Sequence, residues 1–148
     1  MAYITSDDMA TWLGETTLRQ LSNLDQAAAT VDTDAVDEAI ADAEAEINAV
    51  LAVRYTLPLS SPYPTIVVAL AKRLTRWRLY DRQPGEPPPS VVKSFERDRD
   101  ILRQLRKGEA LPGLNTAGEV ATAAASPRAR IHGSGQGRVF GSGGMTGF

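Results

Sequence analysis

Residues 31–51 read VDTDAVDEAIADAEAEINAVL, and they set the architecture of the chain. Asp32 and Asp34 stand at the start, where a carboxylate can accept hydrogen bonds from the unpaired N–H groups of a first helical turn. Because a helix turns once in about 3.6 residues, apolar side chains at spacings of three and four share one face. The stretch therefore predicts a long helix. Its buried face carries Val36, Ile40, Ala43, Ile47 and Val50 or Leu51, and its outer face carries Asp37, Glu38, Asp42, Glu44 and Glu46.

Two shorter helices are predicted before this one. Thr5 or Ser6 can cap a helix that ends at Gly14. A second helix covers about residues 15–23, with Leu18 and Leu21 facing inward. Residues 24–33 then form a connection to the long helix.

Two longer helices are predicted after it. The first, over about residues 64–80, is strongly apolar and is expected at the centre of the core. Its inward positions are Ile66, Val67, Leu70, Leu74 and Trp77, and its basic outer side carries Lys72, Arg73, Arg76, Arg78 and Arg82. The last helix, over about residues 90–107, ends at Gly108 as a cap. Its narrow apolar stripe contains Val91 or Val92, Phe95, Leu102 and Leu105, and charged residues that include Asp98 and Asp100 decorate the other sides.

Proline and glycine divide the remaining chain. Pro58, Pro62 and Pro64 cannot lie inside a helix, so residues 55–64 are expected to form a rigid, extended crossing. The last 23 residues contain seven glycines and no acidic residue, a composition that cannot build a core of its own. The predicted fold class is therefore all-α: a small bundle of about four to five helices over residues 1–112, followed by an extended glycine-rich tail over residues 113–148 that is ordered only on a partner.

Charge is divided unevenly along the chain. Residues 1–52 hold eleven acidic residues and one basic residue, a net charge of −10, whereas residues 53–148 hold 15 basic and seven acidic residues, a net charge of +8. One end of the molecule could attract the other end of a neighbouring copy. Alternatively, the two halves neutralise each other within one monomer. The sequence leaves both readings open.

Residues that could carry catalysis or hold a cofactor are scarce. There is no cysteine, and the single histidine, His132, lies in the glycine-rich tail, where a preorganised site is not expected. Asp25, Asp32 and Asp34 flank a loop that lacks the glycine and the oxygen ligands of a calcium site. No apolar run approaches the roughly 20 residues that a membrane span needs. We therefore expect neither an enzyme nor a metal or cofactor site, and no membrane partner.

Three segments together resemble a known family. They are Met1-Ala2-Tyr3-Ile4-Thr5, the helical run from Ala39 to Ile47, and Arg54-Tyr55-Thr56-Leu57-Pro58-Leu59. With Leu70-Ala71 and Arg78-Leu79-Tyr80, they make the chain similar to the small Mu-like phage and prophage proteins of the head-to-tail joining region, over about residues 1–112. This family often has an aspartate- and glycine-rich loop near residues 25–34, which the present chain lacks.

The resemblance implies a structural virion protein of the neck: an adaptor, or connector, made in the host cytoplasm. About twelve copies would form a ring between the portal protein and the tail or a stopper or terminator protein, with genomic DNA passing through the lumen. By analogy with other adaptors, the tail would dock on the portal through Arg128, Arg130, Ile131, Arg138, Val139, Phe140 and Phe148. Two alternatives are a tail-completion protein and a nucleic-acid-binding packaging accessory protein.

The contact between neighbouring copies is expected to use opposite charges. Its predicted residues are Asp37, Glu38, Glu44, Arg54, Arg73 and Arg76. For Arg54 and Tyr55 a structural role is the alternative, with Tyr55 packed under the proline crossing and Arg54 capping the helix that precedes it.

Overall fold

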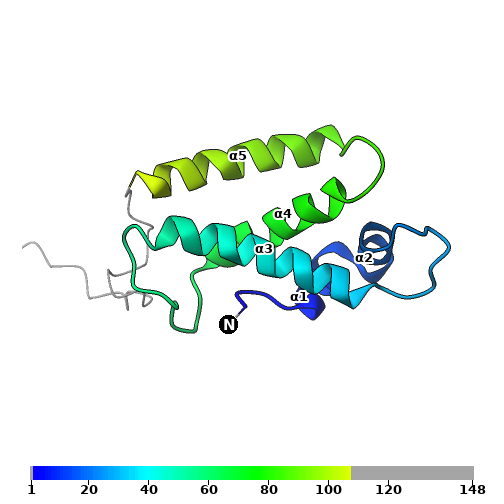
Figure 1. Cartoon of the computed structure of the whole chain (residues 1–148), viewed down its shortest axis with the longest axis horizontal. Helices are drawn as coiled ribbons and strands as arrows, with labels where there is room; N and C mark the ends of the chain where they lie inside the picture. The colour runs from blue at the N-terminus through cyan, green and yellow to red at the C-terminus, as the bar shows by residue number, and fades with distance from the viewer. Residues whose placement is uncertain (1, 108–148) are drawn as a thin grey trace, which may run out of the picture.

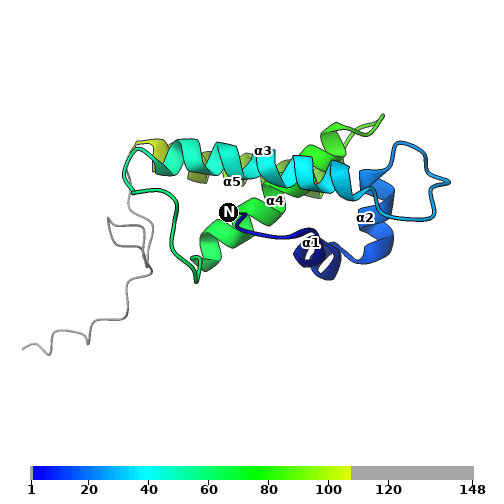
Figure 2. The same cartoon turned by 60° about the horizontal axis from the view of Figure 1, so that its bottom comes forward.

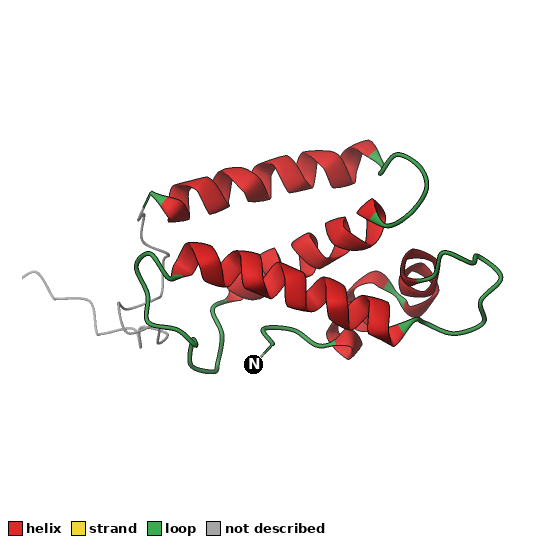
Figure 3. Cartoon of the chain, viewed as in Figure 1, coloured by secondary structure: helices red, strands yellow, loops and turns green. Residues whose placement is uncertain are grey.

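The computed structural model describes residues 2–107, which form five α-helices and, within that range, no strand. The loops that join the helices are shown in Figure 3. The predicted all-α fold is confirmed. The predicted cap Gly108 and the predicted tail over residues 113–148 lie outside the described residues. The helices are α1 (Ser6–Leu13), α2 (Glu15–Ser22), α3 (Thr33–Leu51), α4 (Thr65–Asp81) and α5 (Pro89–Arg106).

Helices α3 and α4 form the centre of the bundle. α5 packs on both of them. α2 also packs on both, and α1 packs on α3. Figure 1 shows α5 along one side of the α3–α4 pair and α1 with α2 on the opposite side. Figure 2, turned by 60°, also shows α1 and α2 separated from α5 by the central pair. The bundle therefore has two different outer sides.

The core follows the predicted stripe of α3. Val36, Ala43 and Ile47 are at most 1% exposed, and Ile40, Val50 and Leu51 are also buried. On α4, Val67, Leu70 and Leu74 are buried as expected, but Ile66 and Trp77 are half-buried. Buried in addition are Ala71, Thr75 and Leu79. The buried surface of α4 is broad because α3 and α5 cover two of its sides.

The helix ends follow the sequence closely. The Thr5 hydroxyl accepts a hydrogen bond from the Asp8 N–H at 3.2 Å, while the Thr5 N–H donates to the Asp8 carboxylate at 2.9 Å, which completes a capping box. α1 ends at Gly14, whose φ of +84° lies in the region that glycine adopts without strain. Asp32 caps α3 by accepting a hydrogen bond from the Ala35 N–H at 3.1 Å. All three predicted helix boundaries are confirmed.

The crossing between α3 and α4 is not the extended segment that the prolines predicted. It bends at residues 57–58 and again at 61–62, where the Leu57–Pro58 and Ser61–Pro62 peptide bonds are cis. Tyr55 and Leu59 are both buried in the core. The segment folds back on the bundle because two of its apolar side chains are buried there. Prolines exclude a helix, but they do not dictate a straight path.

Tyr3 joins the N-terminal segment to the bundle. Its hydroxyl donates a hydrogen bond to the side-chain oxygen of Asn48 on α3, and its ring meets the edge of Tyr63 with 5.1 Å between ring centroids. Burial, followed by the negative charge of Glu44, raises the pKa of Tyr3 to about 12. The segment before α1 is therefore part of the packed structure.

The capping box predicts a pH-dependent loss of stability. Hydrogen bonds from the backbone and then the side chain of Thr5 lower the pKa of Asp8. A carboxylate with a lowered folded-state pKa adds stability above its ordinary pKa of about 4, and this stability is lost as the pH falls through the lowered value. We expect Asp8→Ala to lower the free energy of unfolding by about 1 kcal/mol at pH 7 and by less at pH 3.

Urea unfolding followed by circular dichroism at both pH values measures this difference. Asp7→Ala is the matched control, since Asp7 is also exposed in the first turn of α1 but takes no part in the capping box. An Asp8→Ala effect that is equally large at pH 3 would contradict the assignment.

Candidate functional site

Ion pairs join the acidic face of α3 to basic residues of α4 within the same chain. The Arg78 guanidinium lies 2.9 Å from the Glu46 carboxylate, and that of Arg82 lies 3.4 Å from the Glu38 carboxylate. Both pairs are partly exposed, and pairs of this kind each contribute about 0–1 kcal/mol. The predicted neutralisation within one monomer therefore occurs for these four residues.

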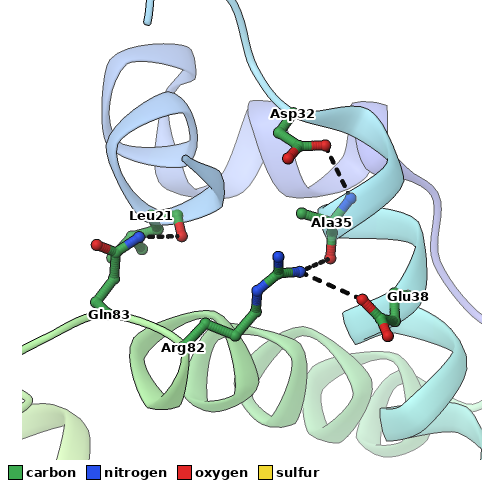
Figure 4. A network of polar contacts seen from close by, with 6 residues as sticks. All are labelled: Leu21, Asp32, Ala35, Glu38, Arg82 and Gln83. Carbon is green, nitrogen blue, oxygen red and sulfur yellow. Dashed lines mark hydrogen bonds and ion pairs between the residues drawn. The ribbon is translucent and has the colours of Figure 1, made fainter. Parts of the chain in front are cut away.

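Arg82 and Gln83 fasten the end of α4 to α2 and α3 (Figure 4). Arg82 also donates a hydrogen bond to the backbone oxygen of Ala35 at 3.4 Å. Gln83 donates from its side-chain nitrogen to the backbone oxygens of Leu21 at 2.9 Å and Asn23 at 2.8 Å. The last carbonyls of a helix lack partners in their own helix, so Gln83 satisfies the end of α2. The sequence placed Gln83 in a loop without a role, and no local pattern linked it to residues about 60 positions earlier.

The strongest ion pair lies between α4 and α5. The Nε atom of Arg73 donates to both carboxylate oxygens of Asp98, at 2.8 and 2.9 Å, and a second nitrogen lies 2.8 Å from Asp98 Oδ1. Asp98 is only 1% exposed. The prediction that Asp98 faces outward is therefore wrong, whereas Arg73 is half-buried, with its guanidinium turned toward Asp98. Asp98 falls between Val91 and Leu102 at spacings of seven and four, which belong to the buried stripe of α5.

Two aromatic contacts link α4 to α1 and α5. The Arg76 guanidinium lies over the Trp12 ring of α1 at 5.2 Å, and Trp77 stacks on Phe95 of α5 with 4.0 Å between ring centroids. Arg76 and Arg73 thus both have partners inside the chain. Of the other residues predicted at an interface between copies, Asp37 and Arg54 are exposed and Glu44 is half-buried. Their role between copies stays a prediction.

The exposed charges that remain lie on two different helices. α5 and its cap expose Lys93, Arg97, Arg99, Arg103, Arg106 and Lys107, against Glu96 and Asp100. The N-terminal half of α3 exposes Asp34, Asp37 and Asp42. The exposed surface of α5 and that of the N-terminal half of α3 therefore differ in charge.

The described part of the chain brings no metal-binding group together. Among residues 2–107, no three His, Cys, Asp or Glu side chains are grouped as metal ligands would be. The loop aspartates have local tasks instead: Asp25 accepts a hydrogen bond from the Ala27 N–H at 2.9 Å, and Asp32 caps α3. His132 lies outside the described residues, as do the predicted portal-docking residues from Arg128 to Phe148. Within the same range, no helix is long and apolar enough to span a membrane.

The fold defines a small helical bundle with charged surfaces. A family profile described as "Bacteriophage Mu, Gp36" matches residues 3–131. The chain therefore belongs to the Bacteriophage Mu Gp36 family and is a protein of a Mu-like phage. A comparison with curated proteins finds no match.

The extent of this match corrects the earlier resemblance. The resemblance ended near residue 112, whereas the family match continues to residue 131. It therefore includes Arg128, Arg130 and Ile131 of the predicted docking tail. Arg138, Val139, Phe140 and Phe148 lie beyond it.

The buried ion pair predicts a large effect from a small substitution. Asp98→Asn keeps the shape of the side chain but removes the charge that faces Arg73, and we expect the free energy of unfolding to fall by about 3 kcal/mol. Asp100→Asn on the same helix is the control. Asp100 pairs with Arg103 at 2.7 Å on the exposed surface, so the expected loss is under about 0.5 kcal/mol. Urea unfolding of both variants measures the difference, and equal losses would disprove the special role of Asp98.

Proposed function

We propose that this chain is a structural subunit of the phage neck, where copies form a ring between the portal protein and the tail. Membership of a Mu-like phage family supports a role in the phage, and the resemblance to head-to-tail joining proteins points to the neck. The observation that carries the proposal is the unlike charge of the exposed surfaces of α5 and of the N-terminal half of α3. A surface that attracts the opposite side of the next copy favours a closed head-to-tail ring.

In this role the protein acts by binding and not by catalysis. Each contact between copies is weak alone, but a ring of about twelve copies meets a symmetric portal at many points at once. Multivalent docking makes the whole attachment strong without any single strong contact. DNA passes through the lumen without sequence-specific recognition, and the tail or a stopper protein binds the opposite surface of the ring.

Electron microscopy of particles from a phage that lacks this protein tests the proposal. Filled heads and complete tails should accumulate separately, and adding the purified protein should join them. Defective tails beside filled heads would instead indicate a tail-completion protein. Complete, infectious particles would disprove a role in joining.

A truncation tests the predicted tail separately. A chain that ends at Pro112 keeps all five helices, so its circular dichroism and melting temperature should match those of the full chain. We expect heads that carry this chain to gain tails at less than about a tenth of the wild-type frequency, because multivalent docking on the portal is lost. Normal assembly with the truncated chain would show that residues 113–148 do not anchor the ring.

A further inference from the structure

A groove lined with arginines runs between α3 and α5. It is lined by the apolar side chains of Ala49, Val50 and Leu102 and by Arg99, Arg103 and Arg106, and its volume is about 310 Å³. The one carboxylate of its lining, Glu46, is paired with Arg78 of α4. Such a groove combines apolar side chains with a positive edge formed by the arginines of α5. It is suited to an amphipathic element that carries carboxylates beside small or apolar side chains.

The arginines of this groove are available to a partner. Arg103 pairs with Asp100 on the same helix, where both side chains are more than 60% exposed, and Arg99 lies 5.9 Å from the Phe95 ring. Contacts this exposed are weak and exchange readily. Arg106 has no ion pair among residues 2–107. The positive edge is therefore only partly neutralised within the described part of the chain, by the exposed Asp100.

A matching element lies on the N-terminal half of α3. Asp34, Asp37 and Ala41 recur at spacings of three and four and are all exposed, and we call this row the acidic edge. Neither aspartate has an ion pair within the described range. A shallow groove of about 260 Å³ runs beside the row, lined by residues that include Ile4 and Ile40. The acidic edge thus combines carboxylates, a small side chain and nearby apolar surface.

The acidic edge and the arginine groove face different ways on one molecule. Asp37 and Glu46 are nine residues apart on α3, which at about 100° per residue places these two on opposite sides of the helix axis. Ala41 and Ala49 are eight residues apart, about 80° around the axis and about 12 Å along it. Glu46 lines the arginine groove. Figure 1 accordingly shows α5 on one side of α3 and the N-terminal segment on the other. One molecule cannot bring these two surfaces together, but two copies arranged head to tail can.

We infer that the acidic edge of one copy inserts into the arginine groove of the next copy. This inference rests on the proposed ring and names the surfaces that would close it. It replaces Arg73 and Arg76 as the basic side of the contact, because those two residues are engaged with Asp98 and Trp12 inside the chain. It keeps Asp37 on the acidic side. In this contact the row of side chains on α3 of one copy lies in the groove between α3 and α5 of the next copy.

Disulfide cross-linking of the full chain tests the contact, since the chain has no cysteine of its own. Ala41→Cys places a thiol on the acidic edge and Ala49→Cys places one in the groove, and both leave every charge in place. On one molecule the two positions are about 12 Å apart along α3, too far for a disulfide. The double variant should therefore form a ladder of oligomers under mild oxidation, and a mixture of the two single variants should stop at dimers.

The control variant keeps the cysteine in the groove and moves the second cysteine away from the acidic edge. In Leu24→Cys with Ala49→Cys, the first position is 63% exposed in the connection between α2 and α3, away from the acidic edge. The ladder of the Ala41–Ala49 pair should form at least about tenfold faster than that of the control pair, and 1 M salt should slow it because exposed charges are then screened. Equal rates for the two pairs would overturn the inference, as would a ladder unaffected by salt.

Charge-reversal substitutions on the two surfaces test the contact in a second way. Adding Arg103→Glu and Arg106→Glu to the Ala41–Ala49 pair should slow the ladder about tenfold, and adding Asp34→Lys and Asp37→Lys as well should restore it. Failure of the restoring substitutions in a folded protein would also overturn the contact. If the ladder forms as expected but phage without the protein still joins heads to tails, the contact stands and the neck role fails. If phage without the protein fails to join heads to tails, but the Ala41–Ala49 pair forms its ladder no faster than the control pair, the neck role stands and another surface closes the ring.

Discussion

The packing of the other helices depends on the contact between α3 and α4. Each helix has an apolar face too large to leave in water, and full burial of one large aliphatic side chain stabilises a fold by about 1.5–3 kcal/mol. Val36 and Ile47 of α3 and Val67 and Leu70 of α4 are at most 1% exposed. Once these faces meet, α1 and α2 can cover one side of the pair and α5 the other. The bundle therefore gains two distinct outer sides.

This arrangement also decides which charges face solvent. The basic side of α4 approaches acidic α3 and the buried aspartate of α5, so several of its arginines have partners inside the chain. The exposed basic residues of α5 and the exposed aspartates of α3 are left on different sides. A molecule with unlike sides can attract copies of itself in one orientation, and repetition of such a contact produces a ring where the rotation between copies closes and an open filament where it does not. The proposed neck role follows from this asymmetry together with the phage family.

Sequence reasoning located the elements well and the interactions between them poorly. The five helices, the Thr5 and Asp32 caps and the end of α1 at Gly14 all follow from local patterns. The bends of residues 55–64 do not, because burial of Tyr55 and Leu59 depends on where the bundle offers space. For the candidate contact, Asp37 was foreseen, whereas the arginine groove exists only because α5 lies beside α3.

Periodicity, caps and proline positions were enough to predict the helices of residues 2–107, because each depends on neighbours within a turn or two of the backbone. The division of charge along the chain follows from composition alone. The pairing of Arg73 with buried Asp98 needed the packed structure. The two residues are 25 positions apart, and a buried carboxylate needs a compensating charge or hydrogen-bond donors, which Arg73 supplies here from another helix. Which charges stay exposed was likewise decided by the packing of α3, α4 and α5, since an ion pair that is buried between helices, as that of Arg73 and Asp98 is, leaves little charge at the surface.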